Sequence, residues 1–329
     1  MKQIFGKDKT LKYFSLAINN NALNHLYIIS APKGQGKKTV AHHIATMLHC
    51  EGANPPCGVC SSCIKHSSGN HPDLCVVAAD SPTASIGVDT VRQLTTDIYI
   101  KPLIASKKIY IIADGQNLTA EAQNSLLKIL EEPPSYAVIF LLTTSREALL
   151  QTVLSRGILL TLSGNTLEEV LSFISSSFPE IREDEKRLIA SVSCGNIGLA
   201  KQMCESGSFS EMRSLLYPVF SAFCGSDKSV IFDALALFEK YKNETNTLLE
   251  LLNIWLRDVL YLKTAQDECG ILNTDFKENI ISFSSKTRAE GIIKVAGRIS
   301  DVASTIGKGS NLSLWITDML IKCWEDLHG

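Results

Sequence analysis

The sequence predicts an α/β fold in the first half of the chain and an all-α fold in the second half. Up to about residue 163, short apolar runs rich in β-branched residues alternate with segments of helical periodicity. Beyond that point the strand-like runs cease, and apolar residues recur at helical spacing. The chain has 329 residues, of which 45% are hydrophobic and 20% charged. This composition excludes a disordered chain and suits two or three packed domains.

Five apolar runs are predicted to form a parallel sheet. They lack the polar alternation of half-exposed strands, so we expect them to be buried on both faces. The helices between them would make right-handed crossovers. Thr119 is a suitable N-cap for the fourth of these helices, and Pro133 ends it. The expected strands are 26–30, 74–79, 109–113, 138–143 and 158–162, and the expected helices are 9–20, 37–49, 88–97, 120–132 and 145–155.

The second half is predicted to hold two helical domains. Three helices, at 166–178, 183–194 and 197–204, precede a Gly-Ser boundary at 207–208. About five longer helices follow it. We therefore expect three domains, at 1–163, 164–206 and 207–329, with a cysteine-rich module at 50–63 inside the first.

Charge and hydropathy exclude two classes of protein. The 32 Lys and Arg residues against 34 Asp and Glu residues give a net charge of −2, so general binding to nucleic acid is not the whole role of this surface. No apolar run approaches about 18 residues, and the first ten residues contain no signal-peptide core. We expect a cytoplasmic protein without a membrane partner.

A glycine-rich segment at 31–39 joins the first strand to the following helix. This is the place of a phosphate-binding P-loop, in which backbone N–H groups and a helix N-terminus face phosphates. Two positions depart from the motif, because Ala31 replaces the first glycine and Lys38 replaces the Mg²⁺-binding hydroxyl. The segment either binds a phosphate weakly or is a turn that binds nothing. The candidate phosphate-binding residues are Gly34, Gly36 and Lys37.

The end of the third strand carries a second defect. A working ATPase places two carboxylates there, one for Mg²⁺ and one for the attacking water. Here the strand is followed by Ala113 and Asp114, so only one carboxylate is available. Defects at two independent catalytic positions indicate that Mg²⁺-dependent hydrolysis of ATP has been lost.

Four cysteines lie within fourteen residues, at Cys50, Cys57, Cys60 and Cys63. Short C-x-x-C steps allow neighbouring thiolates to share one ion, and four sulfur ligands suit a structural, tetrahedral Zn²⁺. An iron–sulfur cluster is the rival, and disulfides do not suit a reducing compartment. No ligand position is left open for catalysis. The other six cysteines are scattered.

The segment 120–134, AEAQNSLLKILEEPP, gives the most specific signal. Together with the strand VIFLLTT and with Ser155-Arg156, it resembles the AAA+ clamp-loader subunits of bacterial DNA polymerase III. The cysteine module resembles the same family, in which the first gap between cysteines is longer. Cys50 is therefore the least certain ligand, with His49, His66 and His71 as substitutes. The resemblance implies a RecA-like AAA+ domain, a small helical lid domain and a C-terminal helical collar domain.

Within that family, the gamma/tau motor subunits keep a full P-loop, an Asp-Glu pair and a sensor-2 arginine. Here Gly198 stands at the sensor-2 position, whereas Arg156 is kept. The combination resembles the branch that does not hydrolyse ATP but lends an arginine finger in trans to a neighbouring motor ATPase. The implied partners are gamma/tau, the delta subunit and, indirectly, the sliding clamp and primer-template DNA. ATP would not be hydrolysed by this chain, and its binding is doubtful.

Two other functions fit parts of the sequence. One is a gamma/tau-type ATPase that tolerates a degenerate active site. The other is a zinc-containing module that binds nucleic acid and is unrelated to clamp loading. For Arg156 itself, the alternative to a finger is an ordinary surface ion pair.

Overall fold

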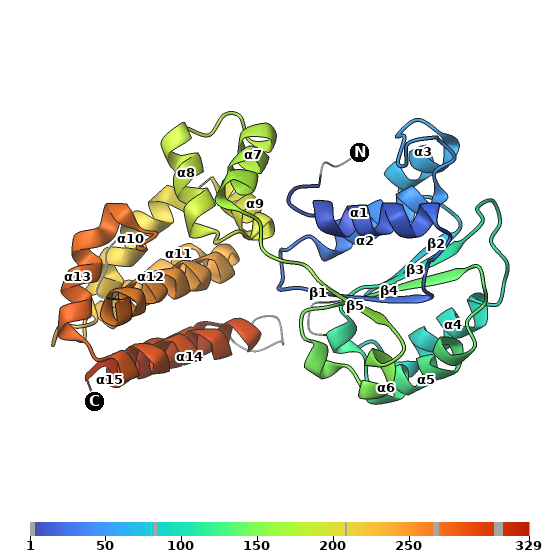
Figure 1. Ribbon diagram of the computed structural model, residues 1–329. Helices are drawn as coiled ribbons and strands as arrows, with labels where there is room; N and C mark the ends of the chain where they lie inside the picture. The colour runs from blue at the N-terminus through green and yellow to red at the C-terminus, as the bar shows by residue number, and fades with distance from the viewer. Residues whose placement is uncertain are drawn as a thin grey trace. The chain divides into compact units, whose positions relative to one another are not determined.

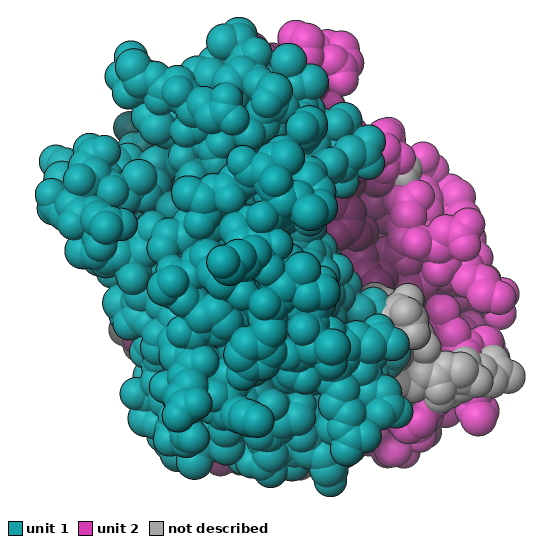
Figure 2. Space-filling view, turned by 90° about the vertical axis from the view of Figure 1, so that its right-hand side faces the viewer, with its two compact units in different colours: residues 1–169, 196–198 teal, residues 170–195, 199–329 magenta. Residues whose placement is uncertain are grey.

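The computed structural model describes residues 4–79, 81, 84–207, 209–265, 270–305 and 312–328. The chain divides into two compact units, which Figure 2 shows in different colours. Unit 1 comprises residues 1–169 and 196–198, and unit 2 comprises residues 170–195 and 199–329. Ser208 of the predicted domain boundary and Cys269, one of the six scattered cysteines, lie outside the described part of the chain.

Unit 1 is built on a parallel sheet of five strands in the order β2-β3-β4-β1-β5. The predicted α/β architecture is confirmed. The central strands β1, β3 and β4 are buried almost throughout, whereas the edge strands β2 and β5 are partly exposed. The strands are β1 Leu26–Ser30, β2 Leu74–Val77, β3 Lys108–Ile112, β4 Ala137–Thr143 and β5 Ile158–Thr161.

Helices cover both faces of this sheet (Figure 1). Because side chains alternate along a strand, Tyr27 and Ile29 pack on one face with α1 and α2, whereas Leu26 and Ile28 pack on the other with α4 and α5. Each of the central strands β1, β3 and β4 therefore contributes to two separate cores. The helices of this unit are α1 Asp8–Asn19, α2 Lys37–His49, α3 Ser61–Ser67, α4 Val88–Asp97, α5 Ala120–Glu131 and α6 Gln151–Leu154, with 3₁₀ turns η1 Gly115–Asn117 and η2 Arg146–Ala148.

The prediction of one continuous helix at 145–155 is wrong. The segment is split into the 3₁₀ turn η2 and the single helical turn of α6. The buried Gln123 of α5 explains the break, because its amide donates to Ala148 O at 3.0 Å and accepts from Leu150 N at 2.7 Å. Backbone groups that a continuous helix would pair internally are bonded to a side chain of another helix instead.

The rest of the chain is helical, and the described residues after β5 contain no strand. From residue 209 onward they form six α-helices rather than about five, because α13 buries Ile280 and Phe283 as a separate helix. Trp255 of α12 is fully buried, and the centroid of its ring lies 4.6 Å from that of the Phe283 ring. The helices are α7 Leu167–Ser177, α8 Glu183–Val192, α9 Ile197–Ser206, α10 Phe209–Ala222, α11 Val230–Lys240, α12 Thr245–Ala265, α13 Lys277–Lys286, α14 Ala289–Thr305 and α15 Leu312–His328, with 3₁₀ turns η3 Lys242–Glu244 and η4 Thr274–Phe276.

None of the helices in the described residues is both long enough and apolar enough to span a bilayer.

Candidate functional site

The glycine-rich loop lies between β1 and α2, as the sequence predicts. Gly34 and Gly36 have φ angles of +85° and +80°, a conformation that glycine adopts without steric cost. The ammonium group of Lys37 donates to the loop's own carbonyl oxygens, to Ala31 O at 2.6 Å and to Pro32 O at 2.9 Å. Burial lowers the pKa of Lys37, and the nearby Asp114 opposes that shift. The lysine expected to face a phosphate therefore satisfies the loop backbone in this structure.

Residues 196–198, which belong to unit 1, contact the same loop. The side-chain amide of Asn196 donates to Lys33 O, and Gly198 N donates to Gly34 O, each at 2.9 Å. A Cβ atom at position 198 would lie 2.5 Å from Gly34 Cα and 2.8 Å from Gly34 O. The backbone at position 198 is thus packed against the loop backbone, and an arginine does not fit there without movement of the loop.

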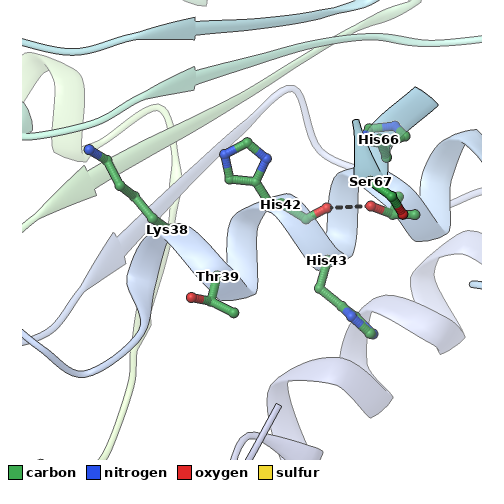
Figure 3. A pocket seen from close by; sticks show the side chains of 7 residues that line it. Lys38, Thr39, His42, His43, His66 and Ser67 are labelled. Carbon is green, nitrogen blue, oxygen red and sulfur yellow. Dashed lines mark hydrogen bonds between the residues drawn. The ribbon is translucent and has the colours of Figure 1, made fainter. Parts of the chain in front are cut away.

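Lys38, the residue at the position of the P-loop hydroxyl, borders an open cavity of about 660 Å³ between α2 and α3 (Figure 3). Burial lowers the pKa of His42, and the neighbouring Lys38 lowers it further. The cavity is lined by Lys38, Thr39, His42, His43, Thr46, His66 and Ser67.

The four predicted cysteines come together. The sulfur atoms of Cys50, Cys57, Cys60 and Cys63 all lie within 4.8 Å of one another. Backbone N–H groups donate to them: Cys57 N to Cys50 Sγ at 3.2 Å and Cys60 N to Cys57 Sγ at 3.4 Å. Donors of this kind stabilise thiolates, so the donor set and its surroundings fit a metal ion.

The thiols differ in their acidity. Backbone hydrogen bonds from Glu51 and Cys63 lower the pKa of the Cys60 thiol to about 6. Backbone hydrogen bonds from Val59 and Cys60 also lower the pKa of Cys57. Burial instead raises the pKa of Cys63 to about 12. A divalent cation bound among the sulfurs would favour the deprotonated form of all of them.

Cys50 belongs to the sulfur cluster, although the sequence made it the least certain member. The three histidines considered as its substitutes, His49, His66 and His71, form a separate cluster of their own.

Arg156 follows α6, just before β5. Its guanidinium donates to Glu131 Oε1 at 2.7 Å and to Thr152 O at 2.8 Å, and its side chain is 32% exposed. The ion pair considered for this residue is thus present. A guanidinium has five N–H donors, so these two contacts leave others available.

Gly157 explains how the chain passes from Arg156 into β5. A Cβ atom there would lie 2.8 Å from Leu26 Cδ2 and 3.1 Å from Ile28 Cδ1 of the neighbouring strand β1. The absence of a side chain lets the Arg156 segment lie directly against the central strand.

Three side chains make long-range contacts around Arg156, the glycine-rich loop and α6 that the sequence did not predict. Glu131 lies inside the quoted motif, but only the fold brings it to Arg156, 25 residues later. Gln123 and Asn196 each bond to a distant backbone segment. Side-chain amides carry no periodic signal, so composition and spacing give no indication of these contacts.

Comparison with known proteins places the chain in a family. The family model described as "DNA polymerase III, delta subunit" matches residues 6–166. The delta' subunit of DNA polymerase III from Bacillus subtilis is 31% identical over 264 residues, 79% of this chain and 79% of that protein. The gamma/tau subunit from Mycobacterium tuberculosis H37Rv is 32% identical over 156 residues, 47% of this chain but 27% of that longer protein. A solved gamma-subunit-related protein from Thermotoga maritima covers 95% of this chain and 98% of its own, with a TM-score of 0.49 and 18% identity.

The likeness to delta' and gamma/tau subunits, together with the parallel α/β sheet, defines a clamp-loader-type subunit of DNA polymerase III. Within that class, the chain belongs to the DNA polymerase III delta' subunit family.

The contact at position 198 leads to a prediction about stability. Gly198→Ala should lower the free energy of unfolding by about 1–3 kcal/mol, because the added methyl group overlaps the loop backbone. The matched control is Gly297→Ala in α14, where a Cβ meets nothing within 4 Å. That change should stabilise the protein by about 0.5–1 kcal/mol through helix propensity. Urea unfolding of both variants measures the difference, and equal effects would contradict the close packing at position 198.

Proposed function

We propose that this protein is a non-hydrolysing subunit of the replicative clamp loader. It would supply Arg156 as a trans arginine finger to a neighbouring motor ATPase and so help to load the sliding clamp onto primed DNA. Gamma/tau motor subunits and a delta subunit would be its direct partners. The observation that carries the proposal is a contrast: Arg156 is kept and partly exposed, while Gly198 is packed against the chain's own glycine-rich loop.

The chemistry of Arg156 suits this role. A planar guanidinium binds two phosphate oxygens at once and offsets the charge that develops on a transferring γ-phosphoryl group. Such a residue needs no nucleotide in its own subunit. The contacts with Glu131 and Thr152 orient the group while leaving N–H donors for a phosphate.

The chain's own nucleotide site lacks the groups that hydrolysis needs. Lys37 is bonded to loop carbonyls, Lys38 replaces the metal-binding hydroxyl, and Gly198 provides no cation. Asp114 is the single carboxylate among residues 113–116, which directly follow β3. We therefore infer that ATP is not hydrolysed here and that Gly34, Gly36 and Lys37 bind a phosphate weakly at most.

The sulfur cluster would hold a structural Zn²⁺ through Cys50, Cys57, Cys60 and Cys63. Four sulfur donors favour zinc over hard cations such as Mg²⁺. The ion would crosslink a module that contains only the short helix α3, and no open ligand position would remain for catalysis.

Two further assignments belong to the same proposal. The chain would work in the cytoplasm, and it would comprise an AAA+ α/β domain at 1–163, a helical lid domain at 164–206 and a collar domain at 207–329.

The second candidate function is a gamma/tau-type ATPase, which the 32% identity to the Mycobacterium tuberculosis subunit favours.

The zinc assignment predicts about one zinc ion per chain in protein purified without chelators. Cys57→Ser should remove most of that zinc and lower the melting temperature more than Cys204→Ser, because losing one ligand weakens the remaining metal bonds. Cys204 is half-buried in α9, is not a member of the sulfur cluster, and serves as the control. Metal analysis and thermal melts measure both effects. A brown iron–sulfur chromophore, or equal melting shifts for the two variants, would reject structural zinc.

The isolated chain should hydrolyse ATP no faster than a buffer blank, because no group in its loop positions Mg²⁺ and water. A phosphate-release assay on the pure protein measures this. Turnover at the rate of a motor subunit would favour the gamma/tau-type alternative instead.

The finger role predicts the effect of Arg156→Ala in the reconstituted complex. Zinc content and ring assembly should be unchanged, while hydrolysis at the one neighbouring site should fall on the order of 10³-fold. Bulk ATPase should fall less, since the other sites keep their own fingers. Arg156→Lys should restore little, because an ammonium lacks the planar fork.

Arg146→Ala is the matched control for that experiment. Arg146 lies on the 3₁₀ turn η2, and its side chain is 63% exposed and paired with Glu147. The Arg146→Ala substitution should have almost no effect on the ATPase activity of the complex. If Arg156→Ala were equally silent in a fully assembled ring, Arg156 would be a surface ion pair only.

A further inference from the structure

A cluster of histidines beside the cysteine module is not used by the proposed function. His49 ends α2, His66 lies in α3, and His71 precedes β2. One ring nitrogen of each lies within 4.8 Å of the others. Five of the seven histidines of the chain fall between residues 42 and 71. The folding of this region thus concentrates imidazoles at one place.

The hydrogen bonds of His49 prepare one ring nitrogen as a ligand. Its Nε2 lies 3.0 Å from Lys107 O, a carbonyl that only accepts, so Nε2 carries the proton. Nδ1 is therefore unprotonated, and its lone pair accepts a hydrogen bond from His66 Nε2 at 2.9 Å. A histidine that ligates a metal through one nitrogen typically donates its other N–H to a backbone carbonyl in this way.

His71 supplies the second, independent observation. The residue is 4% exposed, and its Nδ1 accepts a hydrogen bond from Asp73 N at 3.2 Å. Its Nε2 is buried and has no hydrogen-bond partner. Since Nδ1 accepts, the neutral ring carries its proton on Nε2, and leaving this buried N–H unpaired costs on the order of 1–3 kcal/mol. Transfer of the proton to Nδ1 would leave a lone pair on Nε2 that an ion can bind.

We propose that His49, His66 and His71 form a second metal site, which binds a divalent transition-metal ion through imidazole nitrogens alone. Imidazole ligands suit ions such as Zn²⁺, Ni²⁺ and Cu²⁺ and do not suit Mg²⁺ or Ca²⁺. The site is separate from the four thiolates, although His49 directly precedes Cys50. His66 also lines the open cavity of Figure 3, which gives an entry path and room for a water as fourth ligand.

Binding changes the protonation and orientation of the rings. The rings of His49 and His71 stack with centroids 4.2 Å apart, and those of His66 and His71 with centroids 4.5 Å apart. The ring of His66 must turn so that its lone pair, rather than its face, points to the ion. The bond between His49 and His66 then breaks, and His66 and His71 each exchange the Nε2 proton for one on Nδ1, so that the rings stay neutral and Nε2 can bind the ion. In His71, a proton on Nδ1 ends the hydrogen bond that this atom accepts from Asp73 N. At 3.2 Å, that bond is longer than the two that His49 makes with His66 and with Lys107 O.

The alternative is that the three rings only pack together and join α3 to the sheet. A metal count separates the two, because packing alone binds no ion. Full-length protein would be loaded with excess Zn²⁺, desalted and analysed for metal. Two ions per chain are expected, against one if only the cysteines bind.

Cobalt substitution then identifies the ligands. Titration with Co²⁺ should give thiolate-to-metal charge-transfer absorption for the first equivalent, followed by a second equivalent that adds only ligand-field bands. His66→Gln should remove the second equivalent and leave the thiolate signal intact, which also shows that the module is folded. His71→Gln should do the same.

His43→Gln is the matched control, since His43 borders the same cavity but lies outside the cluster. It should keep both equivalents. Saturation at one ion per chain in the wild-type protein would overturn the proposal. So would equal loss of the second ion from the His43 and His66 variants, which would identify adventitious binding by surface imidazoles.

Discussion

The pairing of the central strand β1 with β4 on one side and β5 on the other is the constraint on which both candidate sites depend. A buried strand bonded on both sides has one register, because a shift by one residue would exchange the side chains of its two faces. Its carboxyl end therefore fixes where the glycine-rich loop begins and where α2 starts. Helix α2 in turn carries the chain to His49 and Cys50, at the start of the cysteine module. The same pairing places β5, and with it Arg156, beside β1.

The glycine-rich loop and Arg156 use their polar groups in opposite ways. In the loop, Lys37 and residues 196–198 bond to carbonyl groups of the loop itself, so the groups that would serve a nucleotide stabilise the fold. Arg156 is also bonded within the chain, but its side chain remains partly exposed and keeps unused donors. An ion pair at such a surface contributes at most about 1 kcal/mol, so exchanging Glu131 for a phosphate of higher charge costs little. Under the proposed function, this asymmetry would be the physical basis for a subunit that assists a neighbour's reaction without one of its own.

The region between α2 and β2 places two kinds of ligand side by side. Sulfur atoms gather around a turn with short cysteine spacings, while imidazoles gather where α2, α3 and the segment before β2 meet. The sulfur cluster is local in sequence, and the proposed metal ion would crosslink there a module too small to bury a core of its own. The imidazole cluster joins that module to the sheet domain, since His49 also bonds to Lys107 just before β3.

The sequence by itself determined the elements whose information is local. Unbroken apolar runs predicted all five strands, helical periodicity predicted α2 and α4 to the residue, and short cysteine spacings predicted the sulfur cluster. Contacts between distant segments were decided only by the tertiary structure. Gln123 breaks the helix expected at 145–155, Glu131 pairs with Arg156, and Gly198 meets Gly34, each across at least 25 residues of chain. The reason is physical: a single polar side chain or a close backbone approach leaves no periodic pattern in the sequence, because its partner is chosen by the packing of the whole sheet domain.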